Sequence, residues 1–392
     1  MAKISLPKSL KSKLPRNKNL PEGISLLRQL NAKANATTLN LGLGKPEEDM
    51  PKALRGMAEE AIRESKLDYT ENAGDLGVRS ALSDRLGLSG GKSFILTHGA
   101  QEGLMAALTA VLNRGDEVLV PDPGFLAYAT MVKIQGGKAV AYTLPKKEGA
   151  FQHDLKEISK KITTRTRAII VSSPGNPTGC DLSDEAFAEL KKLAARKRIV
   201  IISDEVYGML HFHKPYAPLA RAHDSVISIN SFSKSHALTG WRIGFIASEN
   251  PALLQACLIA HQYIATCASV PSQRFLGKLL ASPLYDQVAN DYRVHYQKKL
   301  ELFKNASSPE LRAKTPDACG SFYLFPELPK RGENSLKFCE ALLQKENVLA
   351  IPGSVFGKKG EGSIRLSLAL PDEQVAKAAT ILSKYYATSK KS

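Results

Sequence analysis

Cysteine is scarce in this chain of 392 residues: there are five, an odd number, and no two of them form a CxxC pair. This pattern excludes a disulfide framework and a cysteine zinc site, and it favours a reduced, intracellular protein. Aromatic residues make up 7% of the chain, charged residues 23% and hydrophobic residues 43%. These are ordinary globular values, so collagen, coiled coil and intrinsic disorder are excluded. The length alone predicts two or three domains.

Long hydrophobic runs are missing as well. The N-terminal stretch contains prolines and no apolar run of signal-peptide length. The longest uncharged stretch, Asn250 to Gln273, is interrupted by Pro251, Pro271 and several polar side chains. It therefore predicts a buried helix rather than a membrane span. We expect a cytoplasmic protein that does not bind a membrane.

Acidic residues are outnumbered. The 54 Lys and Arg residues against 38 Asp and Glu residues give a formal net charge of +16, and six of these bases and no acid lie in residues 1–20. Such a surplus favours anionic ligands. No interleaving of basic and aromatic residues and no DNA-reading motif accompanies it, so nucleic acid is not an expected partner.

Seven short apolar runs rich in β-branched residues alternate with helix-like stretches between about residues 92 and 250. They are Ser93–Leu96, Glu117–Val120, Ala139–Tyr142, Ala168–Val171, Val200–Ser203, Val226–Ile229 and Ile243–Ala247. One intervening stretch, Asp184–Arg196, has apolar residues at helical spacing. The alternation predicts an α/β fold with a mostly parallel seven-stranded sheet sandwiched by helices. Ligands of such sheets bind at the carboxyl ends of the strands.

The pattern changes after residue 250. Longer helical stretches run to about residue 305, strands are expected near Phe322–Leu324 and Ile364–Leu368, and a helix is expected from about residue 372 to the end. We expect an N-terminal arm over 1–40, a large domain over 41–290 and a smaller α+β domain over 291–392, joined by part of the N-terminal segment.

The most informative segment is Ser231-Phe-Ser-Lys-Ser-His-Ala-Leu-Thr-Gly-Trp-Arg-Ile-Gly244, which follows the expected strand Val226–Ile229. Lys234 is therefore expected on a loop at the carboxyl end of a strand. The hydroxyls of Ser231 and Ser233 lie beside it in sequence, and Arg242 follows eight residues later. Ser-x-Ser-Lys alone is equally typical of a solvated loop, so the argument depends on the full string.

The full string resembles the cofactor-lysine signature of the class I/II aminotransferases, pyridoxal-phosphate enzymes of fold type I that include aspartate aminotransferase. Further segments are similar to the family's motifs in the same order: Gly42-Leu-Gly-Lys-Pro46, Tyr69, Leu96-Thr-His-Gly-Ala-Gln-Glu-Gly-Leu104, Pro123-Gly-Phe-Leu-Ala-Tyr128, Ser173-Pro-Gly-Asn-Pro-Thr-Gly179, Ser203-Asp-Glu-Val-Tyr207, Gly320-Ser-Phe-Tyr323 and Ser363-Ile-Arg-Leu366. The resemblance covers roughly residues 38–385 and implies a fold type I transferase.

The resemblance implies pyridoxal 5'-phosphate as the cofactor, with Lys234, Asp204 and Tyr207 as catalytic residues. Lys234 would form a Schiff base with the cofactor, since a lysine beside cations and away from bulk water has a lowered pKa and becomes a nucleophile and proton carrier. Asp204 would keep the ring nitrogen protonated, and Tyr207 and Asn176 would hydrogen-bond the phenolic oxygen. Phe125 would stack on the ring.

The cofactor's phosphate calls for N–H donors and positive charge, which a strand turning into a helix can supply at the helix N-terminus. The residues implied here are Gly99, Ala100, Gln101, Ser231, Ser233 and Arg242. Tyr69 resembles the tyrosine that reaches the phosphate of the neighbouring subunit, which implies a homodimer with shared active sites.

The substrate's α-carboxylate would be bound by Arg365, which lies within an apolar strand, together with Asn176 and a backbone group near Gly44. Lys45 departs from the family, which has an acidic residue there, and adds a positive charge near the expected substrate entrance. His211 and His213 show no metal partners, and no metal site is expected.

The expected activity is ping-pong transfer of the α-amino group of an L-amino acid to a 2-oxo acid. One alternative keeps the cofactor but catalyses carbon–sulfur β-elimination or other Cα chemistry, because a fold does not fix a reaction. Another is a non-catalytic, ligand-sensing or nucleic-acid-associated protein, for which a lead-in of about 40 residues is too short to hold a helix-turn-helix domain. The preferred amino acid is not indicated.

Overall fold

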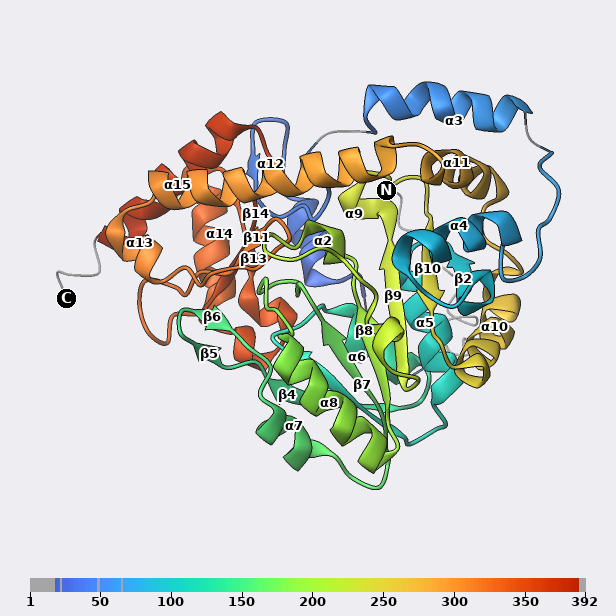
Figure 1. The fold of residues 1–392 in the computed structure, drawn as a ribbon. Coiled ribbons are helices and arrows are strands. Elements are labelled where there is room, and N and C mark those ends of the chain that lie inside the picture. The colour runs from blue at the N-terminus through green and yellow to red at the C-terminus, as the bar shows by residue number, and fades with distance from the viewer. Residues whose placement is uncertain (1–17, 22, 48–49, 65, 388–392) are drawn as a thin grey trace, which may run out of the picture.

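The computed structural model describes residues 18–21, 23–47, 50–64 and 66–387, so residues 1–17 of the N-terminal arm lie outside the described residues. Its centre is a seven-stranded sheet in the order β2-β10-β9-β8-β7-β3-β4 (Figure 1). The strands are β2 (Phe94–Thr97), β3 (Glu117–Asp122), β4 (Lys138–Thr143), β7 (Thr166–Ser172), β8 (Val200–Asp204), β9 (Val226–Ser231) and β10 (Gly244–Ala247). Each corresponds to one of the seven predicted apolar runs.

The sheet is parallel except at β10, which pairs antiparallel with β2 and β9. Successive residues of β7 show why the strands are continuously apolar. Ile170 packs in one buried cluster, with residues of the flanking helices α5, α6 and α10, whereas Ile169 and Val171 pack in another, with residues of α7 and α8. Both faces are covered, as expected for a parallel sheet, and the predicted fold class is confirmed.

The covering helices are α5 (Ala100–Val111), α6 (Ala127–Ile134), α7 (Leu155–Lys161), α8 (Asp184–Lys197) and α10 (Pro251–Ala265). Their ends carry ordinary sequence signals. In α8 the Ser183 side chain accepts a hydrogen bond from the Ala186 N–H, acidic residues occupy the first turn, and basic residues occupy the last. The cap supplies a hydrogen-bond acceptor for a free N–H at the start of the helix, and the charged residues at both ends interact favourably with the helix macrodipole. The predicted helix over 184–196 is thus confirmed.

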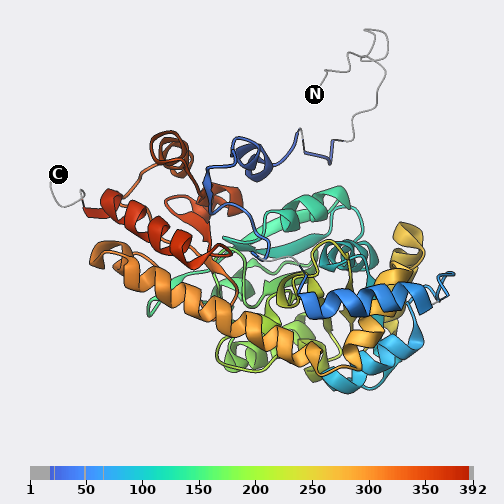
Figure 2. The same ribbon diagram turned by 90° about the horizontal axis from the view of Figure 1, so that it is seen from above.

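The C-terminal part contains a second, smaller sheet, in the order β11 (Tyr323–Leu324), β14 (Ile364–Ser367), β13 (Ile351–Pro352), with helices α13 (Pro309–Ala313), α14 (Ser335–Glu346) and α15 (Asp372–Ala387). The arm joins it, because β1 (Leu39–Asn40) pairs with β12 (Val348–Leu349). Helix α12 (Leu284–Ala306) runs across both parts in Figures 1 and 2, and the proposed boundary at residue 290 lies inside it.

The remaining elements border these two parts. They are α2 (Leu26–Asn31), α3 (Lys52–Glu64), α4 (Leu76–Leu86), the four-residue helix α9 (Phe232–Ser235), α11 (Val270–Leu280) and a small hairpin of β5 (Lys146–Lys147) and β6 (Ala150–Phe151). Helices α3 and α4 pack on α11.

The expectation of one buried helix over 250–273 is wrong. Helix α10 ends at Ala265, Thr266 takes a left-handed conformation with φ of 62°, and α11 begins at Val270 with proline in its first turn. Helix α10 is also not buried all round, because Ile259 and Tyr263 are exposed. Of the helices that the structure describes, none has the length and apolarity needed to cross a membrane. All five cysteines are free.

Candidate active site

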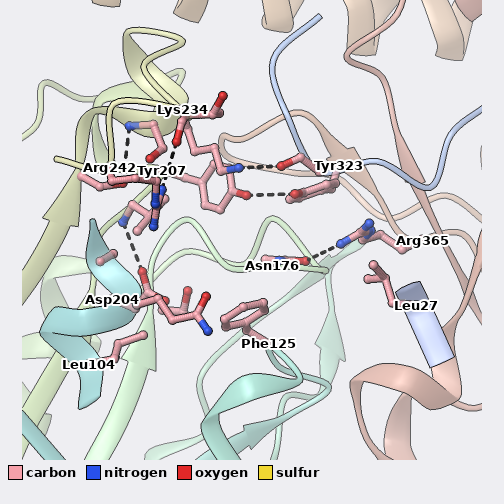
Figure 3. A pocket seen from close by; sticks show the side chains of 18 of the residues that line it. Leu27, Leu104, Phe125, Asn176, Asp204, Tyr207, Lys234, Arg242, Tyr323 and Arg365 are labelled. Atoms are coloured by element: carbon pink, nitrogen blue, oxygen red, sulfur yellow. Dashed lines mark hydrogen bonds between the residues drawn. The ribbon is translucent and has the colours of Figure 1, made fainter. Parts of the chain in front are cut away.

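The carboxyl ends of five strands meet at one edge of the large sheet and surround a cavity of about 350 Å³. β2, β3, β7, β8 and β9 lead directly into the predicted motifs. The lining residues are Leu27, Arg28, Gly44, Ala100, Gln101, Leu104, Phe125, Ser172, Asn176, Asp204, Val206, Tyr207, Ser231, Ser233, Lys234, Thr239, Arg242, Tyr323 and Arg365. In Figure 3, Arg242, Leu104 and Asp204 lie on one side of the cavity and Tyr323, Arg365 and Leu27 on the other. The structure thus brings together almost every predicted site residue.

Lys234 projects into this cavity from α9, whose first turn is capped by the Ser231 hydroxyl. Its Nζ donates a hydrogen bond to the Gly44 carbonyl oxygen at 2.5 Å. Burial, reinforced by the charges of Arg365 and Arg242, lowers the pKa of Lys234 to about 8. About a tenth of this amine is therefore neutral and nucleophilic at pH 7, far more than for an ordinary lysine.

Asp204 ends β8 and lies buried at the cavity. Its Oδ2 accepts a hydrogen bond from the Tyr128 hydroxyl at 2.6 Å, and its Oδ1 accepts one from the Val206 N–H at 3.2 Å. Burial outweighs these bonds and raises the pKa of the Asp204 carboxyl. A carboxylate in this environment is stabilised by any cationic group that enters the cavity. Phe125 also lines the cavity and packs edge-to-face on Tyr128, with ring centroids 5.5 Å apart.

Tyr207 and Tyr323 form a hydrogen-bonded pair of hydroxyls, with oxygens 2.9 Å apart (Figure 3). Gly44 lies against this pair: a Cβ atom added there would stand 2.3 Å from the Tyr323 hydroxyl oxygen. The loop after β1 can approach the cavity closely only because residue 44 has no side chain.

Arg365 lies on β14 and is 2% exposed. It donates hydrogen bonds to the Gly42 carbonyl at 2.7 Å and to Asn176 Oδ1 at 3.4 Å, and its guanidinium lies over the rings of Tyr323 and Phe356. Its buried Nε has no hydrogen-bond partner in the part of the chain that the structure describes. Among the described residues no carboxylate forms an ion pair with Arg365, which leaves the guanidinium able to bind a carboxylate from outside.

The side of the cavity near α5 has the features of an anion site. Gly99 is the N-cap of this 12-residue helix and has φ of 75°, a left-handed conformation that favours glycine. Its missing side chain leaves room for Arg242, whose Nη2 would lie 2.8 Å from an added Cβ. The N-terminal residues Ala100 and Gln101, the hydroxyl residues Ser231 and Ser233, and Arg242 all line this part. Helix N–H groups, hydroxyls and a guanidinium together suit a phosphate.

Two residues singled out in the sequence, Tyr69 and Lys45, lie elsewhere, and so does Glu205, to which the sequence assigned no role. Tyr69 is 85% exposed and does not line the cavity. Lys45, which was expected near the substrate entrance, is exposed and is not among the residues that line the cavity. Glu205, next to Asp204, accepts hydrogen bonds from Tyr216, Leu219 and Ser228 outside the cavity. Burial raises its pKa to about 7.

The sequence shows no metal partner for His211, but in the structure ligand atoms of Asp181, His211 and Cys319 lie within 4.8 Å of one another. However, Nδ1 of His211 accepts a hydrogen bond from the His213 N–H at 3.1 Å. The ring proton of neutral His211 is then on Nε2, which lies 3.4 Å from Asp181 Oδ1. A metal requires an unprotonated nitrogen, so the geometry favours a direct contact between His211 and Asp181 over a bound metal.

Leu27, Arg28 and Tyr323 line the cavity and Tyr128 hydrogen-bonds Asp204, but the sequence did not assign them to the site. The sequence also did not assign the lining residues Leu104, Ser172, Val206 and Thr239. The two tyrosines stand inside the quoted motifs, and the spacing of Tyr128, one helical turn after Phe125, is a signal for a shared face. Leu27 and Arg28 come from the polar lead-in, which gave no signal.

Comparison with known proteins agrees with this geometry. The pattern described as aminotransferase class I and II matches residues 36–382. This chain belongs to the class I and II aminotransferase family. Among curated relatives of this aminotransferase, the aspartate aminotransferase of Pyrococcus horikoshii is 33% identical over 370 residues, which is 92% of this chain and 94% of the relative.

Solved structures give the same result. The aromatic aminotransferase of Pyrococcus horikoshii matches this aminotransferase with a TM-score of 0.84 and 30% identity, over 93% of this chain and 99% of that one. The aspartate aminotransferase of Thermus thermophilus with maleate gives a TM-score of 0.85 and 27% identity, over 93% and 97%. The predicted family, fold type and amino-group transfer are confirmed, and the lyase and non-catalytic alternatives are not favoured.

Proposed function

We propose that this aminotransferase binds pyridoxal 5'-phosphate through Lys234 and uses it to transfer the α-amino group of an L-amino acid to a 2-oxo acid. One observation carries the proposal. A lysine whose pKa is lowered to about 8 shares a single cavity with a buried carboxylate, Asp204, and with the buried guanidinium of Arg365, which pairs with no carboxylate of the described residues.

The residues present fit this cofactor. The glycine cradle at Gly99, with the N-terminus of α5, Ser231, Ser233 and Arg242, suits its phosphate. Asp204 suits a cationic ring nitrogen, and Tyr207 and Asn176 offer a hydroxyl and an amide for the ring's phenolic oxygen. Phe125 offers an aromatic face at the same cavity. When bound, the cofactor supplies an electrophilic carbon and an electron sink for the substrate's Cα.

Lys234 carries the chemistry that the chain itself provides. Its neutral Nζ acts first as a nucleophile and later as a base that removes the proton from the substrate's Cα. Burial, and after it the cations of Arg365 and Arg242, disfavours the protonated ammonium and so raises the fraction of neutral amine. The Gly44 carbonyl, which accepts a hydrogen bond from Nζ, fixes the position of that amine.

Asp204 and Tyr207 set the electrostatics of the cavity floor. Tyr128 and the Val206 N–H orient the Asp204 carboxylate by hydrogen bonds to both of its oxygens. The buried pair of Tyr207 and Tyr323 presents its hydroxyls next to Gly44. These groups are held in place before any ligand enters, which is how preorganised polar groups stabilise developing charge.

Arg365 binds the substrate's α-carboxylate in this proposal, assisted by Asn176 and the backbone near Gly44. The aromatic rings of Tyr323 and Phe356 hold the guanidinium plane, and the free Nε leaves an N–H donor for the carboxylate. Donor and acceptor both carry an α-carboxylate, so the same arginine serves the two halves of a ping-pong reaction.

We also propose a homodimer in which Tyr69 completes the partner's active site. Tyr69 is 85% exposed, and Tyr263 on α10 is 84% exposed, values that are unusual for aromatic side chains left uncovered. The Asn72 side chain donates a hydrogen bond to the Thr266 carbonyl at 2.8 Å, which ties the segment of Tyr69 to the end of α10. The two tyrosines therefore lie on adjoining parts of the surface, which a second copy of this chain could cover in a homodimer.

The test of the proposed function is Lys234→Ala, with Lys92→Ala as the matched control, since Lys92 is exposed and precedes β2 at the opposite edge of the sheet. The variant is expected to lose the visible absorbance of the bound cofactor and nearly all amino-group transfer, whereas the control keeps both. Normal turnover in the Lys234 variant would refute the proposal. Pyruvate and ammonia released from cystathionine without a 2-oxo acceptor would favour the lyase alternative.

A further inference from the structure

The charges that line the cavity are unequal. The described lining residues contribute four cationic side chains, Arg28, Lys234, Arg242 and Arg365, against the single carboxylate of Asp204. In the proposed function, Lys234 is the nucleophile, Arg242 faces the phosphate and Arg365 binds the α-carboxylate. Arg28 is left over, and a second anionic group on the substrate would account for it.

Arg28 is held on the same side of the cavity as Arg365. Its neighbour Leu27 packs against a small buried cluster that includes Ile351 and Phe356, and Phe356 also lies under the Arg365 guanidinium, 5.1 Å from its centroid to Cζ. Figure 3 shows Leu27 beside Arg365. Helix α2 is therefore anchored on the aromatic ring that supports the proposed α-carboxylate site.

A chain of hydrogen bonds also connects helix α2 to Arg365. Asn31 Nδ2 donates to the Leu27 carbonyl at 2.8 Å, and Asn40 Nδ2 donates to Asn31 Oδ1 at 3.4 Å. Asn40 Oδ1 accepts from the Gly42 N–H at 2.9 Å, and the Gly42 carbonyl accepts from Arg365 at 2.7 Å. The helix that carries Arg28 is thus positioned relative to Arg365 by polar contacts as well as by packing.

The Arg28 side chain itself is exposed and uncommitted. Within the described ranges it forms no ion pair and no side-chain hydrogen bond, whereas Lys33, at the end of the same segment, pairs with Glu340 at 3.4 Å. A guanidinium that lines a cavity and has no partner is suited to a carboxylate of the ligand. The adjacent Leu27 offers apolar contact for the methylene groups between two carboxylates.

We propose that Arg28 binds the side-chain carboxylate of the substrate, so that the enzyme acts on dicarboxylic amino acids and dicarboxylic 2-oxo acids. This inference rests on the proposed function, because it assigns the α-carboxylate to Arg365. Arg28 and Arg365 together bind the two ends of such a substrate.

The test compares Arg28→Gln with Lys45→Ala, which removes an exposed cation next to Gly44 that does not line the cavity. Each holoenzyme is assayed for kcat/KM with aspartate and glutamate and with their uncharged counterparts asparagine and glutamine. We expect Arg28→Gln to lower kcat/KM about 10- to 100-fold for the acidic substrates and less than about threefold for the amides, chiefly through KM. Arg28→Lys should restore part of the loss, and Lys45→Ala should change neither class by more than about twofold.

Three results would overturn the inference. They are a wild-type enzyme with no preference for the acidic substrates, equal losses on both classes in Arg28→Gln, and a loss in Lys45→Ala as large as that in Arg28→Gln. A wild-type holoenzyme that converts no amino acid at all would overturn the proposed function as well, which separates the two failures.

Discussion

Gly44→Ala is a small substitution for which the structure predicts a large effect. The added Cβ would stand 2.3 Å from the Tyr323 hydroxyl oxygen, about 1 Å closer than ordinary van der Waals contact. Tyr323 cannot move aside, because it is 1% exposed and is enclosed by Tyr207, Phe322 and Arg365. The loop that carries residue 44 must shift instead, and with it the carbonyl that accepts the hydrogen bond from Lys234.

The magnitude follows from the overlap. Forcing one extra carbon into a packed site destabilises a protein by about 1–3 kcal/mol, and displacement of a reacting group by about 1 Å lowers activity by up to about 100-fold. We therefore expect Gly44→Ala to lower both the free energy of unfolding, measured by urea denaturation, and kcat/KM.

Gly56→Ala is the matched control. Gly56 lies in α3, is exposed, and has open space around an added Cβ. Alanine there should raise the free energy of unfolding by about 0.5–1 kcal/mol through helix propensity and leave kcat/KM unchanged. The reasoning is refuted if the two alanine variants behave alike in both measurements.

Two further predictions concern pH and assembly. Burial and two cations lower the pKa of Lys234 to about 8. In the cofactor-free protein the fraction of neutral amine therefore increases about tenfold per pH unit below pH 8 and levels off above it. The rate of pyridoxal phosphate uptake, followed by absorbance, should show the same pH dependence, and a rate still rising at pH 10 would contradict this prediction. Light scattering should give twice the chain mass of 42.6 kDa. Tyr69→Phe should weaken cofactor retention about 3- to 30-fold, because one hydrogen bond to a charged group is lost. A monomeric protein, or unchanged cofactor retention in Tyr69→Phe, would contradict the proposed shared site.

Much of the fold follows from local sequence rules. The strands of the large sheet are buried on both faces and therefore read as continuous apolar runs, so β7 and β8 were predicted to within two residues at each end. The carboxyl ends of parallel strands meet at one edge, which explains why Asp204 and Lys234, thirty positions apart, could be expected in one site.

The rest depends on contacts that sequence spacing does not reveal. Arg28 reaches the cavity because β1 pairs with β12, which joins Leu39 to Val348 across most of the chain. The spacing of Tyr128 indicates a shared face with Phe125, but only the structure shows its hydrogen bond to Asp204, 76 positions away in the chain. The break between α10 and α11 depends on the left-handed conformation of Thr266, a residue with no preference for it.

The central claim is that the cofactor is attached to the side chain at position 234. Reduction of the holoprotein with borohydride, followed by proteolysis and mass spectrometry, identifies the lysine that carries it. The account predicts the added mass of the reduced cofactor on the peptide containing Lys234 and on no other lysine. Labelling of a different lysine, or a protein that takes up no pyridoxal phosphate, would contradict it.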